Sequence, residues 1–241
     1  MKNILIPTIL EADTVGAVKT AAKHASGQNC AVVLMLLCDV PDTYSAGYLL
    51  QKITPGYTAA QSAVLNKCKE IIKNTPNCVL QVHIQHGISA PLLKGLIEHK
   101  GIGLTILTTS YKQEQQKIHR YCTALLLNSK CPLLHLGQNC TGQLLSKAMY
   151  LEQEKTTVGL QEVQDMINDR FSFTIVSRAM LASEQDPEDL APMLAEAIFK
   201  NDIDVLVETR KPEKVKLNRK SHSVVNEALG MPVLSLYEGV L

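Results

Sequence analysis

The stretch Asn3-Ile4-Leu5-Ile6-Pro7-Thr8-Ile9-Leu10 decides the fold class of this chain. Its apolar residues occupy both alternating faces, which is typical of a strand in a parallel sheet that helices cover on both sides. Asp13 follows at a position that suits an N-cap, and residues 14–26 carry apolar side chains near helical spacing. Gly27 ends this predicted helix. A buried strand that leads into a helix in this way favours an α/β fold.

Strands and helices alternate through the rest of the first half. The apolar segments predict strands at residues 30–40, 77–86, 103–109 and 132–136, and the stretches between them predict helices at residues 58–73, 90–99 and 112–128. Ser89 suits the N-cap of the helix at 90–99, with Pro91 in its first turn. Each crossover is long enough for parallel pairing. We therefore expect a three-layer α/β/α fold with a parallel, doubly wound sheet.

Part of the same order returns in the second half. We expect residues 141–170 to be helical, in two pieces broken near Gly159, followed by strands at 172–178, 203–208 and 232–237 and helices at 186–201 and 221–230. The segment Cys131-Pro132-Leu133-Leu134 has a counterpart in Met231-Pro232-Val233-Leu234. The pattern therefore predicts a full module at residues 1–138 and a reduced copy at residues 139–241 that lacks a clear first and second strand.

The amino-acid composition limits the classes of protein to which this chain can belong. The chain has 241 residues, of which 46% are hydrophobic and 20% charged, and this balance is typical of a globular protein. No apolar run approaches the roughly 18 residues that a membrane span needs, and the first residues do not resemble a secretory signal, so we expect a cytoplasmic protein. The seven cysteines form no Cys-x-x-Cys pair, which favours buried free thiols over a zinc or redox site.

Charge divides unevenly between the halves. Residues 1–138 hold 13 Lys and Arg against 7 Asp and Glu, a balance of +6, whereas residues 139–241 hold 11 against 16, a balance of −5. The halves could dock on each other, or the charges could simply lie on solvated helix faces. With seven Tyr, three Phe and no Trp, the chain offers few rings for stacking on bases, so we expect no nucleic-acid partner.

Several segments, taken in order, resemble one family. Lys2-Asn3-Ile4-Leu5-Ile6-Pro7-Thr8 resembles the opening strand of universal stress proteins, and His86-Gly87, Gly101-Ile102-Gly103 and the closing Cys-Pro-Leu-Leu segment follow in the family's order. The resemblance covers residues 1–138 in full and residues 170–241 for the later part of the module. It implies an adenine-nucleotide-α-hydrolase-like fold in a degenerate tandem protein. Its two halves would imitate the family's usual dimer, with their last strands near one another.

The phosphate-binding residues of that family are missing. Nucleotide-binding members carry an Asp after the first strand, and a Gly-x-x-Gly followed nine residues later by Gly-Ser or Gly-Thr after the fourth. Ile9 stands where that Asp would be, and the two fourth-strand exits read Thr108-Thr109-Ser110-Tyr111 and Thr209-Arg210-Lys211-Pro212. Glycines matter there because they let backbone N–H groups approach phosphate closely. We therefore expect no cofactor, with ATP binding kept as the alternative.

Candidate ligand residues follow from the fold class, because open α/β sheets bind ligands outside the carboxyl ends of their strands. In the first half these candidates are Thr8, Val40, Thr108, Thr109 and Ser110. The hydroxyls of residues 108–110 could bond a ligand, or could instead form a turn and a helix cap. In the second half a basic run at residues 210–222 could bind an anion, or could be a solvated loop; its candidates are Arg210, Lys211, Arg219 and Ser221.

No motif for catalysis accompanies these residues. The chain has no Gly-x-Ser-x-Gly, Walker or dinucleotide-binding loop, and spacing places no carboxylate pair or metal ligands, so we assign no catalytic and no metal-binding residues. The favoured hypothesis is a non-catalytic stress-response or regulatory protein that acts through a protein partner or through self-association as a homodimer. The alternatives are a sensor of a nucleotide or another anion and, last, an enzyme of the wider nucleotide α-hydrolase architecture.

Overall fold

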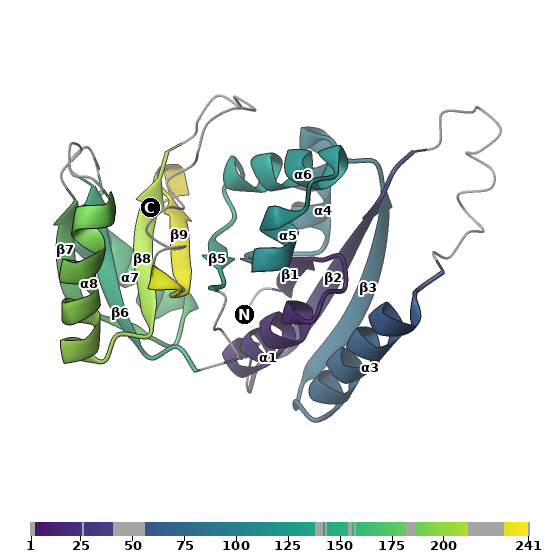
Figure 1. Cartoon of the computed structure of the whole chain (residues 1–241), viewed down its shortest axis with the longest axis horizontal. Coiled ribbons are helices and arrows are strands. Elements are labelled where there is room, and N and C mark those ends of the chain that lie inside the picture. Colours follow the sequence, from purple (N-terminus) through teal and green to yellow (C-terminus); the bar gives the residue numbers. More distant parts are fainter. Residues whose placement is uncertain are drawn as a thin grey trace.

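One sheet with helices on both faces forms the framework (Figure 1). The structure is a computed structural model that describes residues 3–25, 27–40, 56–137, 142, 144–153, 156, 158–181, 187–211 and 229–240. Among these residues, nine strands follow one another across the sheet in the order β3-β2-β1-β4-β5-β9-β8-β6-β7. The predicted three-layer α/β fold is therefore confirmed.

The first half of the chain contributes five parallel strands and their crossover helices. In chain order the elements are β1 (Asn3–Pro7), α1 (Asp13–Ala25), β2 (Cys30–Cys38), α3 (Ala59–Lys73), β3 (Cys78–His86), α4 (Ala90–His99), β4 (Ile102–Leu107), α5 (Thr109–Gln113), α6 (Lys117–Leu127) and β5 (Leu133–His135). All the strands predicted in this half are present, and their observed ends differ from the predicted ends by at most three residues. Ser89 caps α4 by accepting a hydrogen bond from the Leu92 N–H, as predicted.

Two predictions in this half were wrong in detail. The single helix expected at residues 112–128 is instead α5 and α6, because Glu114 and Gln116 have extended backbones that interrupt it. The strand expected to reach Thr109 ends at Leu107, and Thr108 caps α5 by accepting a hydrogen bond from the Tyr111 N–H. Residues 41–55, between β2 and α3, lie outside the described residues.

The second half opens on a strand where we predicted a helix. Its elements are β6 (Lys147–Gln153), α7 (Leu160–Arg170), β7 (Thr174–Leu181), α8 (Pro187–Asn201), β8 (Val205–Arg210), β9 (Val233–Tyr237) and the 3₁₀ turn η1 (Glu238–Val240). Residues 148–151 are all buried, as in a central strand covered on both faces. The Asp204 carboxylate also binds the N–H groups of Ser146 and Lys147 where β6 begins. This tertiary pairing overrides the helix propensity of Ala, Met, Leu and Glu.

The two halves share a strand order. The series β7-β6-β8-β9 repeats β2-β1-β4-β5, and every pair within each series is parallel. The prediction that the second half lacks its first two strands was therefore wrong, since β6 and β7 take the places of β1 and β2. Among the described strands, the one without a counterpart in the second half is β3. The helix expected at residues 221–230 falls almost wholly outside the described residues.

The halves meet through their last strands. β5 and β9 pair antiparallel, with Leu134 opposite Leu234. Both leucines belong to a core that runs beneath α1, α3 and α7 and spans the two halves. On the opposite face two separate cores lie under α4 and α6 and under α8. The predicted proximity of the last strands is confirmed, while the boundary at residues 138 and 139 stays a prediction.

Candidate functional site

The carboxyl end of β1 turns sharply into α1. Thr8 is buried at this end, its hydroxyl lies 2.7 Å from the Thr14 hydroxyl, and it accepts a hydrogen bond from the Leu10 N–H at 2.8 Å. Leu10 has a positive φ of 62°, so these contacts hold a turn that its own side chain disfavours. The predicted ligand residue Thr8 thus has its hydroxyl engaged in shaping the chain reversal.

At the carboxyl end of β4, the polar side chains also form hydrogen bonds to other groups of the chain. The buried Thr108 hydroxyl lies 3.2 Å from the Ser110 hydroxyl, and the Thr109 hydroxyl donates to the Leu136 carbonyl at 3.3 Å. With the bond from Tyr111, these contacts are those of a turn and helix cap. The alternative interpretation of residues 108–110 as a cap therefore matches the geometry.

Asp13 joins the two strand ends. We predicted it as an N-cap, but α1 begins at Asp13 itself and its carboxylate reaches the start of α5. The Ser110 N–H donates to Asp13 Oδ2 at 2.8 Å and the Ser110 hydroxyl donates to Oδ1 at 2.6 Å. A carboxylate of the chain itself thus accepts from the N–H and the hydroxyl of Ser110 at the fourth-strand exit. Sequence reasoning placed Asp13 in the helix but missed this contact, because 97 residues separate the partners.

Val40, the remaining candidate of the first half, has an apolar side chain, unlike the hydroxyl-bearing residues above. Its side chain is 56% exposed. It packs against the turn after β3, where a Cβ added to Gly87 would lie 2.8 Å from Val40 Cγ2. The contact leaves Val40 as a half-exposed apolar side chain at the exits of β2 and β3.

The second half has a polar cluster at the exits of β8 and β9. The Glu238 carboxylate accepts hydrogen bonds from the hydroxyls of Thr156 at 2.7 Å and Thr209 at 3.2 Å, and these hydroxyls lie 2.7 Å from each other. Lys211 Nζ lies 3.6 Å from the other Glu238 oxygen. Burial raises the pKa of the nearby Tyr150. The predicted candidate Lys211 thus lies beside Glu238, whose carboxylate also binds Thr156 and Thr209, and no spacing in the sequence brings these residues together.

Arg210, predicted as an anion ligand, is bound to the backbone at the seam between the halves. Its Nε donates to the Leu127 carbonyl at 3.0 Å, and its Nη2 donates to the carbonyls of Ser129 and Cys131 at 2.9 and 2.6 Å. Its Nη1 donates to the Ser235 carbonyl of β9. Burial lowers the pKa of Arg210 to about 10, so the guanidinium keeps its charge at neutral pH. Arg219 and Ser221 lie outside the described residues.

Six cysteines lie in the described part of the chain. Cys30, Cys68, Cys122 and Cys131 are buried, as predicted, whereas Cys38 and Cys78 are partly exposed. Burial raises the pKa of the Cys30, Cys68 and Cys122 thiols to about 11, which keeps them in the unreactive protonated form.

Within the described part of the chain, no three His, Cys, Asp or Glu residues gather in a way that could hold a metal ion. No helix among these residues is long and apolar enough to cross a membrane.

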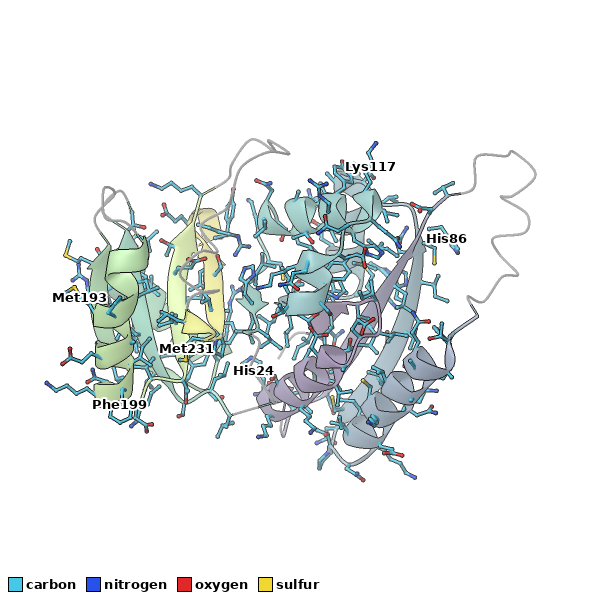
Figure 2. All side chains as sticks on the ribbon, in the orientation of Figure 1. His24, His86, Lys117, Met193, Phe199 and Met231 are labelled. Atoms are coloured by element: carbon cyan, nitrogen blue, oxygen red, sulfur yellow. The ribbon has the colours of Figure 1, made fainter. Side chains whose placement is uncertain are left out.

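One pocket lies on the seam, away from the strand exits. It is a small hollow with a cavity volume of about 20 Å³, between α1, the β5–β9 pair and residues 171–173. His24 stands between the halves there (Figure 2), with its ring 5.1 Å from that of Phe171. Burial lowers the pKa of His24 to about 4, so the imidazole is neutral at physiological pH. The lining is mostly apolar.

Similar proteins are found for this chain by comparison of structures and not by comparison of sequences. No family model matches the chain, and no curated protein matches it by sequence. Among solved structures, a universal stress protein from Archaeoglobus fulgidus DSM 4304 matches with a TM-score of 0.58 and 7% identity, over 98% of this chain and 96% of that one.

Two Pseudomonas aeruginosa structures match similarly. A putative universal stress protein from strain UCBPP-PA14 has a TM-score of 0.54 and 12% identity, over 98% of this chain and 93% of that one. A functionally unknown protein from strain PAO1 has a TM-score of 0.53 and 12% identity, over 98% and 92%. Identities this low establish the fold alone. Over nearly its whole length, the chain has the fold of the universal stress proteins.

Proposed function

We propose that this protein is a degenerate tandem universal stress protein that acts in the cytoplasm as a non-catalytic regulator, through protein contacts. In this proposal it does not bind ATP in the manner of the family. The observation that carries the second part is the pair of hydrogen bonds from Ser110 to the Asp13 carboxylate. A phosphate that approached the fourth-strand exit would compete with a fixed negative charge for the same N–H donor.

The second half supports the same proposal. Thr209, at the β8 exit, is engaged with Thr156 and Glu238, and Glu238 adds another carboxylate at this edge. Arg210 directs its guanidinium at four backbone carbonyls. An anion that recruited Arg210 would leave those carbonyls without their donor, at a cost of about 1–3 kcal/mol for each buried group.

The test is a thermal-shift titration of the full chain with Mg²⁺ and ATP, ADP or AMP. A ligand at 100 times its dissociation constant stabilises the folded state by about 2.7 kcal/mol, which raises Tm by roughly 5–10 °C for a chain of this size. We expect no shift beyond that caused by salt at equal ionic strength. A nucleotide-binding protein in the same assay is the positive control. A concentration-dependent rise in Tm with an adenine nucleotide would refute the proposal.

The alternative function, an anion sensor at the basic run, is read in the same assay. Inorganic phosphate, sulfate and small dicarboxylates are added to the titration. A rise in Tm with one of these, lost in Lys211→Ala and Arg219→Ala, would favour the sensor over the proposed function. Arg210→Ala is unsuitable for this purpose, because its side chain also joins the two halves.

A further inference from the structure

Two cysteines meet where β2 and β3 begin. Cys30 is the first residue of β2 and Cys78 is the first residue of β3, and the two are direct partners in the parallel register of these strands. The Cys30 N–H also donates to the Asn77 carbonyl at 3.0 Å, which fixes the start of one strand against the start of the other. β2 and β3 run side by side from this pair to the Cys38 and His86 pair at their other end (Figure 1). The two cysteines are therefore neighbours in the sheet although they lie far apart in the sequence.

The side chains of Cys30 and Cys78 lie on the same face of the sheet. Cys30 belongs to the core beneath α1, α3 and α7, and Cys78 packs against that core. The two thiols are in hydrogen-bond contact with each other. Adjacent strands lie about 4.8 Å apart, which falls within the Cα separations of about 4.4–6.8 Å that disulfides span. The pair thus meets the distance requirement for a disulfide.

The two thiols differ in their access to solvent. Cys78 is partly exposed, whereas Cys30 is only 4% exposed. Burial raises the pKa of both thiols, to about 11 for Cys30, and the hydrogen bond that Cys30 donates partly offsets the rise for Cys78. Cys78 is therefore the thiol that a small reagent reaches and the one that ionises more easily. Cys30 is held beside it, where proximity compensates for low intrinsic reactivity.

The other described cysteines are placed differently. Cys38 lies on the same strand and face as Cys30, but its partner in register is His86. Cys68 and Cys122 are fully buried in helices. Among the strand pairs of the described residues, β2 with β3 is the one in which two cysteines stand in direct register.

We propose that Cys30 and Cys78 form a reversible disulfide by exchange with a small organic disulfide such as oxidised glutathione. The Cys78 thiolate attacks one sulfur of that disulfide, and the S–S bond breaks to give a mixed disulfide on Cys78 and one small thiolate. Cys30 then loses its proton, and its sulfur attacks the Cys78 sulfur and releases the second small thiolate. The two protein thiols are oxidised, and the small disulfide is reduced to two thiols, which take up the two protons that the cysteines lose.

This inference goes beyond the proposed function and fails separately from it. Cys30 and Cys78 lie at the amino ends of their strands, whereas the strand exits that bear on nucleotide binding lie at the carboxyl ends. Disulfide formation is read without nucleotide, and the thermal shift with nucleotide is read on the reduced chain. A chain that forms no disulfide and ignores ATP would overturn the disulfide alone.

The test is incubation of the full, reduced chain in a glutathione redox buffer at mildly alkaline pH, followed by alkylation and peptide mapping by mass spectrometry. We expect two of the seven thiols to become protected from alkylation, and we expect a peptide pair that joins Cys30 to Cys78. An excess of reduced glutathione should reverse the link. Absence of any link, or a link between another pair of cysteines, would overturn the proposal.

Three single variants separate the roles of the thiols. Cys30→Ala should stop at the mixed disulfide on Cys78. Cys78→Ala should slow the modification of residue 30 by about tenfold or more, because the remaining thiol is buried and protonated. Cys38→Ala is the matched control, since it removes another partly exposed thiol from the same strand and face, and it should leave the link intact.

The wild-type peptide map does not depend on how well any variant folds. A mixed disulfide that persists on Cys78 in the wild type would overturn the proposal, because it would show that the Cys30 sulfur does not reach it. Loss of the link in Cys38→Ala, with the chain still folded by circular dichroism, would overturn it as well.

Discussion

The Asp13 carboxylate holds both the backbone N–H and the hydroxyl of Ser110, at 2.8 and 2.6 Å. The contact ties the first turn of α1 to the start of α5 across 97 residues. It places a negative side chain at the sheet edge where α/β proteins usually meet their ligands. At this strand exit, the Ser110 donors are thus bound by a carboxylate of the chain itself.

Removal of that carboxylate should destabilise the fold. Asp13→Ala leaves the Ser110 N–H without its acceptor and the Ser110 hydroxyl with Thr108 as its remaining partner, so we expect the free energy of unfolding to fall by about 1–3 kcal/mol. Urea denaturation followed by circular dichroism measures the change. Glu11→Ala is the matched control, since it removes the same charge from an exposed neighbour, and it should stay within about 0.5 kcal/mol of the wild type. Equal stability of Asp13→Ala and Glu11→Ala would contradict the role assigned to Asp13.

Arg210 should be essential for the seam between the halves. Arg210→Ala deprives four backbone carbonyls of their donor, those of Leu127, Ser129, Cys131 and Ser235. We expect a loss of about 3 kcal/mol or more in the free energy of unfolding. Arg210→Lys should recover little of it, because an ammonium lacks the planar fork that reaches several acceptors at once.

The control for Arg210 is its neighbour. Lys211 is half-exposed and lies 3.6 Å from the Glu238 carboxylate, so Lys211→Ala should cost less than about 1 kcal/mol. Denaturant titrations of the three variants side by side give the comparison. If Arg210→Ala were no less stable than Lys211→Ala, the guanidinium would not be holding the seam.

Gly137 should resist substitution because the other half of the chain touches it. A Cβ at this position would lie 2.0 Å from the carbonyl oxygen of Gly230 and 2.4 Å from its carbonyl carbon. Both are backbone atoms, so they move only if β5 and the start of β9 separate. Gly137→Ala should therefore lower the free energy of unfolding by about 1–3 kcal/mol or more.

Gly95 provides the opposite control. It lies inside α4, and no heavy atom comes within 4 Å of its added Cβ. Gly95→Ala should raise the free energy of unfolding by about 0.5–1 kcal/mol, since Ala loses less backbone freedom than Gly in a helix. Thermal unfolding of the two variants should move Tm in opposite directions, and a shift in the same direction would count against the close approach of the halves at Gly137.

His24 should make the fold sensitive to mild acid. Burial lowers the pKa of His24 from 6.5 to about 4, so between these values the unfolded chain binds a proton that the folded chain does not. Stability from this source is complete above pH 6.5 and falls as the pH drops toward 4, by as much as roughly 3 kcal/mol. His24→Phe keeps a ring against Phe171 and removes the proton site. Urea titrations at pH 7 and 4.5 should show a smaller loss in this variant, and identical losses would be the contrary result.

Local sequence predicted most of the first half. Segments such as residues 3–7 and 30–38 are apolar throughout, and only a strand between two helix layers buries both of its faces. Ser89 and Pro91 marked the start of α4 because capping depends on neighbours within one turn. The same reasoning did not predict β6, because Ala, Met, Leu and Glu favour a helix by local propensity. The segment is a strand because it pairs with β7 and β8.

The candidate site depended on contacts that local patterns do not encode. Thr108, Thr109 and Ser110 could be placed at a strand exit from sequence, but their partners could not, because Asp13 and Leu136 come from other elements. Thr156 and Glu238 meet across 82 residues, and no motif signals their pairing. Arg210 belonged to a basic run in the sequence, yet it faces carbonyls of the other half.

By itself, the sequence determined the layered α/β class, the parallel direction of the first five strands and the absence of glycines at the fourth-strand exits. Each of these depends on periodicity or on residue type within a short window. The tertiary structure alone decided that β6 is a strand, that the Asp13 carboxylate binds Ser110 at the first strand-exit site, that Arg210 joins the halves and that, among the described residues, β7 pairs with β6 alone. These features depend on which distant segments meet, and that is settled by the packing of the whole sheet.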